Sequence, residues 1–327
     1  MLVLQPESDI LSRGRFAPTP SGHMHVGNAM AALLSWLQLR SQGGAFVLRM
    51  EDVDTGRSRQ HFADSIVHDL TWLGLDWDEG PDAGGHAGPY VQSQRLELYR
   101  EALDKLQAQG LLYSCYCSRA DILAAPSAPH GLSAEGPLYP GTCRHLSQSE
   151  QQLKARTKTP SLRFKVKERF PGFQDDILGP IEINGYASSD FVVRRADGIY
   201  AYQLAVVVDD AAMGITDVFR GADLLDSTPR QLMLYEALEL TPPRFAHFPL
   251  LLDEKGNRLA KRTQGLSIRE LRQRGVSPRR IVGWLAWITG LIGSLQELSP
   301  QELIPLFSME HVPKEPVMLT PDVLNLL

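Results

Sequence analysis

The sequence of 327 residues lacks several features that mark particular protein classes. No run of eighteen apolar residues is present, so no transmembrane helix is expected. Residues 1–13 carry acidic and polar side chains where a signal peptide would need a basic start and an apolar run, so we expect a cytoplasmic protein. Three cysteines, an odd number, do not suggest a disulfide framework.

An excess of charge of one sign is also missing. The 33 Lys and Arg residues against 38 Asp and Glu residues give a net charge of −5. This balance excludes a broadly basic nucleic-acid coat but leaves room for RNA binding through a local patch. We see no internal repeat, and the 43% hydrophobic content is typical of a globular protein with a real core. We expect a monomer without a membrane partner.

The most informative stretch runs from Arg15 to Asn28. It begins in a short apolar segment, passes two prolines and a glycine, and enters an apolar periodic segment over residues 29–39. This order predicts a strand, a tight turn and a helix, whose free N–H groups would form an anion site. The pattern favours a nucleotide phosphate site at the first turn of a doubly wound sheet, and a proline-rich loop with two surface histidines is the alternative.

The residues of this stretch resemble a known signature. His25-Val26-Gly27-Asn28 resembles the HIGH signature of class I aminoacyl-tRNA synthetases, with Asn28 in place of the last histidine. The preceding residues 15–22 resemble the glutamyl-tRNA synthetase version of that block. The resemblance implies an α/β fold: a Rossmann-like doubly wound parallel sheet, an inserted zinc-containing α+β subdomain and a short helical C-terminal part. It also implies that the protein activates L-glutamate with ATP and Mg²⁺.

A second block follows the predicted strand over residues 45–50. In open α/β sheets ligands lie at the carboxyl ends of strands, so the charges of Arg49-Met50-Glu51-Asp52-Val53-Asp54 are candidates for the site. We expect Asp54 or Thr55 to cap the helix that runs towards Leu73, and Glu51 to face the ligand. The order of charges resembles the same family, which implies that Glu51 contacts the bound amino acid.

The second half of the chain contains a further block. Residues 199–210 are densely apolar and predict a central strand or a helix packed on one, and residues 215–219 predict a strand that ends in Arg220-Gly221-Ala222-Asp223. Such a strand end can hold a carboxylate and a ribose, and a surface ion pair is the alternative. Residues 202–231 resemble the family's second catalytic half, which implies that Tyr202 and Arg220 contact glutamate and Asp223 the adenosine side.

A basic pentapeptide follows the strand predicted over residues 245–252. Arg258-Leu259-Ala260-Lys261-Arg262 resembles the KMSKS signature, with Arg258 for the first lysine and Ala260 for the serine. A loop lysine such as Lys261 can stabilise charge on departing pyrophosphate, and a basic solvated loop is the alternative.

The resemblance therefore implies three sets of residues. The catalytic residues are His25 and Lys261. The ATP-binding residues are Pro18, His25, Gly27, Asn28, Asp223, Arg258 and Lys261. The glutamate-binding residues are Arg15, Phe16, Ala17, Pro18, Thr19, Glu51, Tyr202 and Arg220.

All three cysteines lie within 29 positions and flank a proline-rich loop over residues 124–141. A structural zinc would hold such a loop together, and three small buried hydrophobes are the alternative. From chemistry alone His145 is the first choice of fourth ligand. The pattern Cys115-x-Cys117…Tyr139-x-x-x-Cys143 resembles the zinc site of glutamyl-Q tRNA(Asp) synthetases, a family of small glutamyl-tRNA synthetase paralogues. That resemblance implies Tyr139, which we predict as the fourth ligand.

The resemblance implies four parts. Residues 1–110 form the first catalytic half, residues 111–188 the inserted zinc and tRNA-contacting subdomain with strands over 161–166 and 173–183, residues 189–262 the second half with the KMSKS-like loop, and residues 263–327 a helical part.

About sixty residues follow Lys261, so a long anticodon-binding part is not expected. The resemblance then implies tRNA-independent activation of glutamate and its transfer to the queuosine base in the anticodon of tRNA(Asp). One alternative is a truncated glutamyl-tRNA synthetase that charges a tRNA 3′ end. Another is a non-catalytic RNA-binding paralogue.

Overall fold

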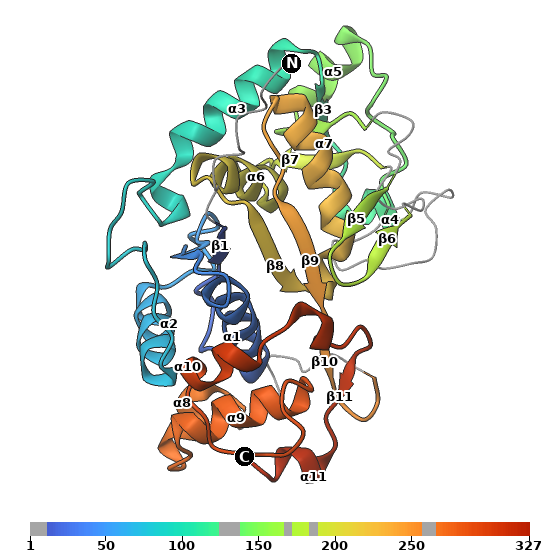
Figure 1. Ribbon diagram of the computed structural model, residues 1–327. Coiled ribbons are helices and arrows are strands. Elements are labelled where there is room, and N and C mark those ends of the chain that lie inside the picture. Colours follow the sequence, from blue (N-terminus) through green and yellow to red (C-terminus); the bar gives the residue numbers. More distant parts are fainter. Residues whose placement is uncertain (1–11, 124–137, 167–171, 183–188, 257–265) are drawn as a thin grey trace, which may run out of the picture.

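The computed structural model describes residues 12–123, 138–166, 172–182, 189–256 and 266–327, and its centre is a six-stranded sheet (Figure 1). The strands follow the order β2 (Ala45–Leu48), β1 (Arg13–Phe16), β8 (Asp217–Gly221), β9 (Arg244–Phe248), β5 (Phe173–Asp175) and β6 (Gly179–Ile181). All neighbours are parallel except the antiparallel pair β5 and β6. The predicted doubly wound parallel sheet is confirmed, with one antiparallel pair at its edge.

The sheet changes direction of winding at β1. From β1 the chain passes through helix α1 (Val26–Arg40) to β2 on one side, and much later β8 pairs with the other side of β1. In open α/β sheets the crevice outside the carboxyl ends of such strands is where ligands bind. The ends of β1 and β8 are therefore the place to look for a site.

Two hydrophobic cores cover the two faces of the sheet. Successive side chains of a strand point to opposite faces, so Val218 joins one core and Phe219 the other. The first core contains α1, α2 (Gln60–Leu73) and helices from the end of the chain; the second contains α3 (Leu96–Ala108), α6 (Tyr202–Ala212) and α7 (Thr228–Leu238). Burial on both faces explains why the strands read as continuous apolar runs.

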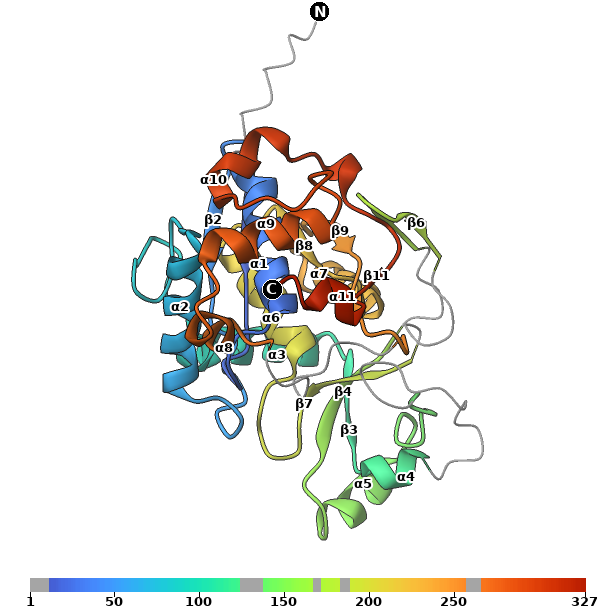
Figure 2. The same cartoon turned by 90° about the horizontal axis from the view of Figure 1, so that it is seen from below.

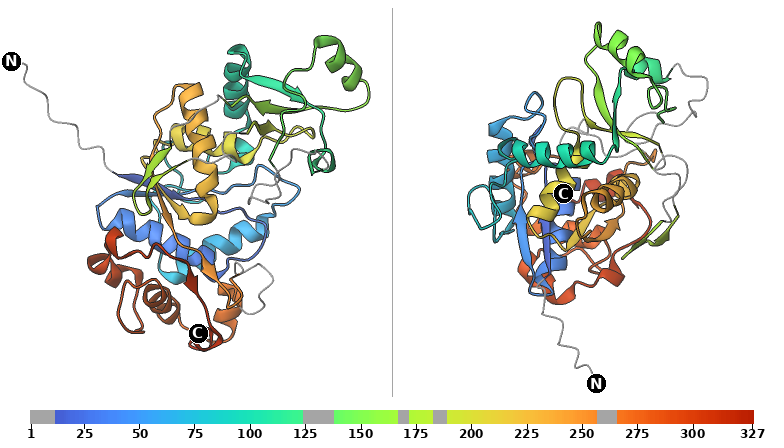
Figure 3. Two further views of the ribbon diagram at one scale, coloured as in Figure 1. Left: turned by 90° about the vertical axis from the view of Figure 1, so that its right-hand side faces the viewer. Right: turned by 90° about the horizontal axis from the view of Figure 1, so that it is seen from above.

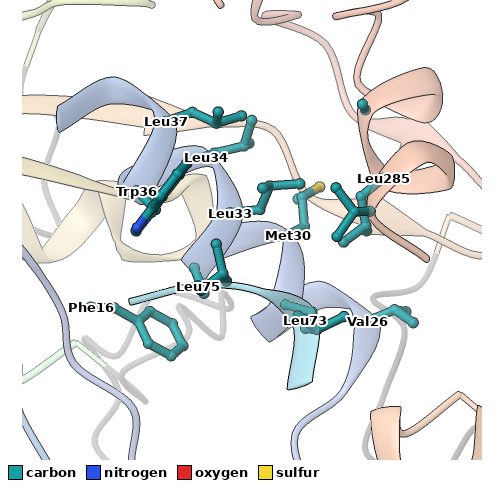
Figure 4. Close-up of a cluster of buried hydrophobic side chains, with 14 of the residues drawn as sticks. Phe16, Val26, Met30, Leu33, Leu34, Trp36, Leu37, Leu73, Leu75 and Leu285 are labelled. Carbon is teal, nitrogen blue, oxygen red and sulfur yellow. The ribbon is translucent and has the colours of Figure 1, made fainter. Parts of the chain in front are cut away.

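Helix α1 is the centre of the first core. Eleven of its fifteen residues are buried, so it is apolar nearly all round. Figure 4 shows Leu33 and Met30 of α1 pointing towards Leu285 of α9 (Pro278–Ile288). Each such fully buried side chain contributes about 1.5–3 kcal/mol.

The start of α2 differs from the prediction that Asp54 or Thr55 caps it. The helix begins at Gln60, and its N-cap residue is Arg59, whose side chain makes no capping bond. The Asp54 carboxylate instead binds Arg195 at 2.8 Å, and the Asp54 carbonyl accepts from Arg57 N–H at 3.0 Å. The residues between β2 and α2 thus form turns, which no helical periodicity could reveal.

A separate antiparallel sheet contains β3 (Leu112–Cys115), β4 (Ser161–Phe164) and β7 (Phe191–Arg194), with the short helices α4 (Arg119–Leu123) and α5 (Gln148–Ala155) beside it (Figure 2). The strands predicted at 161–166 and 173–183 exist, but they do not share a sheet. Asp175 of β5 lies opposite Phe245 of β9, at the edge of the main sheet. Which sheet a strand joins depends on which strand edges are still unpaired in the folded chain, and a local sequence pattern does not encode that.

The helical C-terminal part is confirmed. It contains α8 (Ile268–Gln273), α9, α10 (Pro300–Leu303) and α11 (Pro321–Leu324), and the small pair β10 (Leu251–Leu252) and β11 (Val317–Met318). Ser267 and Ser277 cap α8 and α9 with their hydroxyls. Helix α9 contacts α1 and α2, on the face of the sheet away from α6 and α7 (Figure 3). Over the described ranges, no helix has the length and apolar character needed to cross a membrane.

Candidate active site

A cavity of about 610 Å³ opens at the carboxyl ends of β1 and β8. Its wall brings together residues that lie more than two hundred positions apart in the sequence. Those predicted as site residues are Arg15, Phe16, Ala17, Pro18, Thr19, Gly27, Asn28, Glu51, Tyr202, Arg220 and Asp223. The sequence did not single out the other lining residues, Met30, Ala31, Ser35, Phe219, Gly221, Leu224, Phe248, Leu250 and Leu251.

His25 lies at the edge of this arrangement and not on the cavity wall. It is the N-cap residue of α1, with extended backbone angles, and its carbonyl accepts from Ala29 N–H at 2.9 Å. The backbone of His25 pairs with that of Ser267, and Val26 N–H donates to the Leu266 carbonyl at 3.1 Å. The chain that follows the KMSKS-like pentapeptide is therefore attached to the start of α1. Arg258, Ala260 and Lys261 themselves lie outside the described residues.

A buried charge network fixes one wall of the cavity. Arg49 is fully buried and donates to Asp210 at 2.7 Å and to Glu51 at 3.0 Å, and Arg15 Nε donates to Asp210 at 3.2 Å. Burial alone would raise the pKa of Asp210, but the guanidinium groups of Arg15 and Arg49 outweigh it and lower that pKa. Asp210 therefore stays ionised and holds Arg15 at the wall.

Glu51 and Tyr202 face the same cavity with different chemistry. Burial raises the pKa of Glu51, although Arg49 and Arg15 oppose the shift. A buried carboxylate in this state gains from a further cation, such as an ammonium group of a ligand. Burial also raises the pKa of Tyr202, so its hydroxyl keeps its proton and can donate.

Arg220 presents an uncompensated positive charge to the cavity. It is 5% exposed, and its four partners are neutral: His247 Nε2 at 3.1 Å, Thr228 Oγ1 at 2.8 Å, the Leu224 carbonyl at 3.3 Å and the Tyr202 hydroxyl at 3.5 Å. Among the described residues no carboxylate oxygen lies within 4 Å of its nitrogens. Because a buried charge is stable only when it is paired, Arg220 is suited to bind a ligand carboxylate.

Three residues that surround Arg220 were not predicted from the sequence: His247, Asp175 and Thr228. His247 is one polar residue in an apolar strand, and Asp175 lies 72 positions before it. A histidine within an apolar run is the only local signal that could have pointed to them.

The three cysteines form the cluster that the sequence predicts. Their sulfur atoms lie within 4.8 Å of one another, and Cys117 Sγ is 3.6 Å from Cys143 Sγ. Tetrahedral zinc with Zn–S bonds of about 2.3 Å separates its sulfur ligands by about 3.8 Å, so this donor set fits zinc. The Tyr139 hydroxyl is 3.3 Å from Cys115 Sγ, whereas His145 is exposed and outside the group.

The core around this cluster is small. Its buried members are Tyr113, Cys115, Tyr116, Ile122, Tyr139 and Cys143. The Arg163 guanidinium lies 3.7 Å over the Tyr139 ring and covers it. So few apolar side chains contribute little burial, and a metal would supply stability that the core does not.

Comparison with known proteins identifies the family. Residues 12–326 match the model of "tRNA synthetases class I (E and Q), catalytic domain". Over 96% of its length the chain is 55% identical to a glutamyl-Q tRNA(Asp) synthetase of Symbiobacterium thermophilum and 48% identical to one of Nitratidesulfovibrio vulgaris, and it covers 98% of each.

The fold agrees with this assignment. The glutamate-tRNA synthetase of Elizabethkingia anophelis superposes with a TM-score of 0.81 at 28% identity, over 96% of this chain and 69% of that one. The family model, the two relatives and the fold point the same way. The chain thus belongs to the class I tRNA synthetases for glutamate and glutamine, ligases by activity, and within them to the glutamyl-Q tRNA(Asp) synthetases.

Proposed function

We propose that this glutamate-activating synthetase transfers glutamate to the queuosine base in the anticodon of tRNA(Asp), and that activation needs no tRNA. The observation that carries the proposal is the similarity to two glutamyl-Q tRNA(Asp) synthetases over 98% of their length, at 55% and 48% identity. The likeness to the glutamate-tRNA synthetase of Elizabethkingia anophelis, at 28% identity and 69% coverage, is weaker.

In this proposal, glutamate binds between the two charged walls of the 610 Å³ cavity. Arg220 takes the side-chain carboxylate, because its charge has no carboxylate partner among the described residues. Glu51 accepts from the ammonium group, and the Tyr202 hydroxyl donates. Arg15, Phe16, Ala17, Pro18 and Thr19 complete the pocket from the end of β1.

ATP would occupy the part of the cavity next to α1. Gly27 and Asn28, in the first turn of α1, lie beside the free N–H groups of a helix N-terminus, which suit phosphate. Pro18 and Asp223 belong to the same wall, and His25, Arg258 and Lys261 complete the proposed ATP site. Mg²⁺ bound with ATP would neutralise phosphate charge.

The first step is an in-line displacement. The α-carboxylate oxygen of glutamate forms a bond to the α-phosphorus of ATP while the bond to the β-phosphate oxygen breaks, and pyrophosphate leaves. The protein contributes position and charge, since the reaction needs little covalent help. His25 and Lys261 would stabilise charge on the phosphates.

The second step needs an acceptor hydroxyl next to the adenylate. A second cavity of about 470 Å³ shares Tyr202 with the first, and its wall includes Gln203, Arg163 and Arg230. We assign the modified base to it, because a hydroxyl entering there would approach the glutamyl carbonyl beside Tyr202. The oxygen of that hydroxyl bonds to the carbonyl carbon while the bond from this carbon to the AMP phosphate oxygen breaks. The hydroxyl proton passes to the departing phosphate, AMP leaves, and an ester of glutamate forms.

We assign one structural zinc ion to Cys115, Cys117, Cys143 and Tyr139, because the sulfur spacing and the Tyr139 contact suit a tetrahedral site. Zinc would join the end of β3 to residues 139–143. The same residues approach the 470 Å³ cavity, which Cys117 and Tyr139 help to line.

The test is transfer of labelled glutamate, with ATP, to tRNA from cells that make queuosine and from cells that cannot. We expect label only in the queuosine-containing pool, including tRNA from which the terminal adenosine has been removed. Equal label in both intact pools would identify a synthetase that charges the 3′ end. ATP–pyrophosphate exchange with glutamate and no tRNA should proceed, and its absence would contradict tRNA-independent activation.

A further inference from the structure

We propose that Asp175 and His247 are positioning residues that aim the Arg220 guanidinium at the substrate carboxylate without neutralising it. The inference rests on the proposed role of Arg220 in glutamate binding. Both residues are fully buried and neither lines the glutamate cavity, whereas Arg220, which donates to His247, does line it.

The hydrogen bonds fix the tautomer of His247. Arginine has no acceptor, so the contact of 3.1 Å between Arg220 Nε and His247 Nε2 requires an unprotonated Nε2. The ring proton must then be on Nδ1, which donates to Asp175 Oδ2 at 2.6 Å. Burial lowers the pKa of His247 and favours the neutral ring, although Asp175 opposes the shift.

Asp175 is held as firmly as His247. Its Oδ1 accepts from the backbone N–H groups of Ile177 at 3.0 Å, Leu178 at 2.9 Å and His247 at 3.3 Å. Only Oδ2 remains for the imidazole. This explains what the placement of β5 beside β9 achieves: it brings a carboxylate to the back of the arginine that faces the cavity.

The proposed function depends on the neutral imidazole ring of His247, which lies between the charges of Arg220 and Asp175. A carboxylate bound directly to Arg220 would compete with the substrate carboxylate for the same guanidinium. The imidazole instead gives Nε a hydrogen bond while the negative charge of Asp175 stays one ring away. Thr228 Oγ1 lies 2.8 Å from Arg220 Nη2 and 3.2 Å from His247 Nε2. This uncharged hydroxyl also orients the guanidinium without adding negative charge.

Asp175→Asn tests the inference through the tautomer. The amide oxygen must replace Oδ1, because three N–H groups point at it, so the amide nitrogen faces His247 Nδ1 and donates to it. The ring proton moves to Nε2 and opposes the Arg220 N–H. We expect KM for glutamate to rise roughly ten- to hundredfold, an unchanged KM for ATP, and a weaker preference for glutamate over glutamine.

His247→Gln provides the rescue. Its amide can present an oxygen to Arg220 and an N–H to Asp175, so we expect KM for glutamate to stay within about threefold of the unmodified enzyme. Thr289→Val is the matched control, since it removes a buried hydroxyl that donates at 2.7 Å to the carbonyl of Leu285 in α9, and neither residue lines the glutamate cavity. It should lower stability without changing either KM.

Arg220→Gln separates the binding role of Arg220 from the positioning role of Asp175 and His247. If it raises KM for glutamate and Asp175→Asn does not, the positioning role is wrong and the binding role stands. If Arg220→Gln leaves KM for glutamate unchanged, the binding role itself is wrong. An Asp175→Asn enzyme whose KM values for glutamate and ATP rise together would also overturn the inference, because that pattern indicates a structural defect.

Discussion

The main sheet and the region around the three cysteines are stabilised in different ways. The main sheet has a hydrophobic core on each face, with α1, α2 and the C-terminal helices on one and α3, α6 and α7 on the other. The three-stranded sheet joins the second of these cores through Phe164 and Phe191, and beyond it lies a separate core of six buried residues around the cysteines. One chain thus combines a region that hydrophobic burial stabilises with a region whose cysteines fit a stabilising metal ion. Metal loss and core mutation should therefore affect different regions and different steps.

Removal of a zinc ligand should have the largest effect. Structural zinc contributes on the order of 10 kcal/mol to small sites, so Cys143→Ser should release zinc and disorder the residues that pack around the cysteines. Transfer to tRNA should then fall below detection, while glutamyl-adenylate formation stays within about threefold. Metal analysis and ATP–pyrophosphate exchange measure the two effects.

Ser147→Ala is the control for that experiment. Ser147 caps α5 in the same subdomain, and its loss lowers stability by about 1 kcal/mol. Zinc content and transfer should both survive. If Cys143→Ser abolished exchange as well as transfer, the two regions would not be independent.

Arg220→Gln should have the next largest effect, confined to the main sheet. Loss of a buried partner of a substrate carboxylate lowers kcat/KM for glutamate by roughly a hundred- to a thousandfold. KM for ATP and zinc content should not change. Steady-state exchange kinetics with glutamate varied provides the measurement, and an unchanged KM for glutamate would remove Arg220 from the site.

Leu33→Ala tests the core of the main sheet. Leu33 is 2% exposed in α1, and such a truncation lowers the free energy of unfolding by about 2–5 kcal/mol. Thermal unfolding should shift downwards while zinc stays bound to the folded protein. Zinc release well below the unfolding temperature of this variant would show that the two regions depend on each other.

Acidification should have the smallest of these effects and should separate zinc release from unfolding of the main sheet. Arg15 and Arg49 outweigh burial and lower the pKa of Asp210, so the stability that Asp210 contributes is present above its unfolded value of about 3.9. It is lost as pH falls through the lower, folded value. Thiolate ligands take up protons at higher pH than that. On acidification, zinc release should therefore precede unfolding of the main sheet, as a chelator dye and circular dichroism can follow.

The sequence predicts most of this fold because its signals are local. The strand, turn and helix around His25 and the apolar run at 199–210, which forms α6, follow from short patterns. The cysteine cluster is also visible, since its members lie close in the sequence.

What the sequence does not predict depends on contacts between distant segments. The pairing of β5 with β9 brings Asp175 to His247, and no periodicity encodes which edge of a sheet a strand joins. The predicted cap of α2 was wrong for a related reason, because Asp54 binds Arg195, 141 positions away, instead of capping the helix. The predicted cavity residues came from resemblance; the residues that hold them came only from the structure.

The position of the glutamyl group on tRNA(Asp) tests the proposed transfer to queuosine most directly. After reaction with glutamate and ATP, the tRNA is digested with nuclease and its nucleosides are analysed by mass spectrometry. We expect one added glutamyl mass on the queuosine nucleoside and none on the 3′-terminal adenosine. A glutamyl group on the terminal adenosine, with unmodified queuosine, would contradict the proposed transfer.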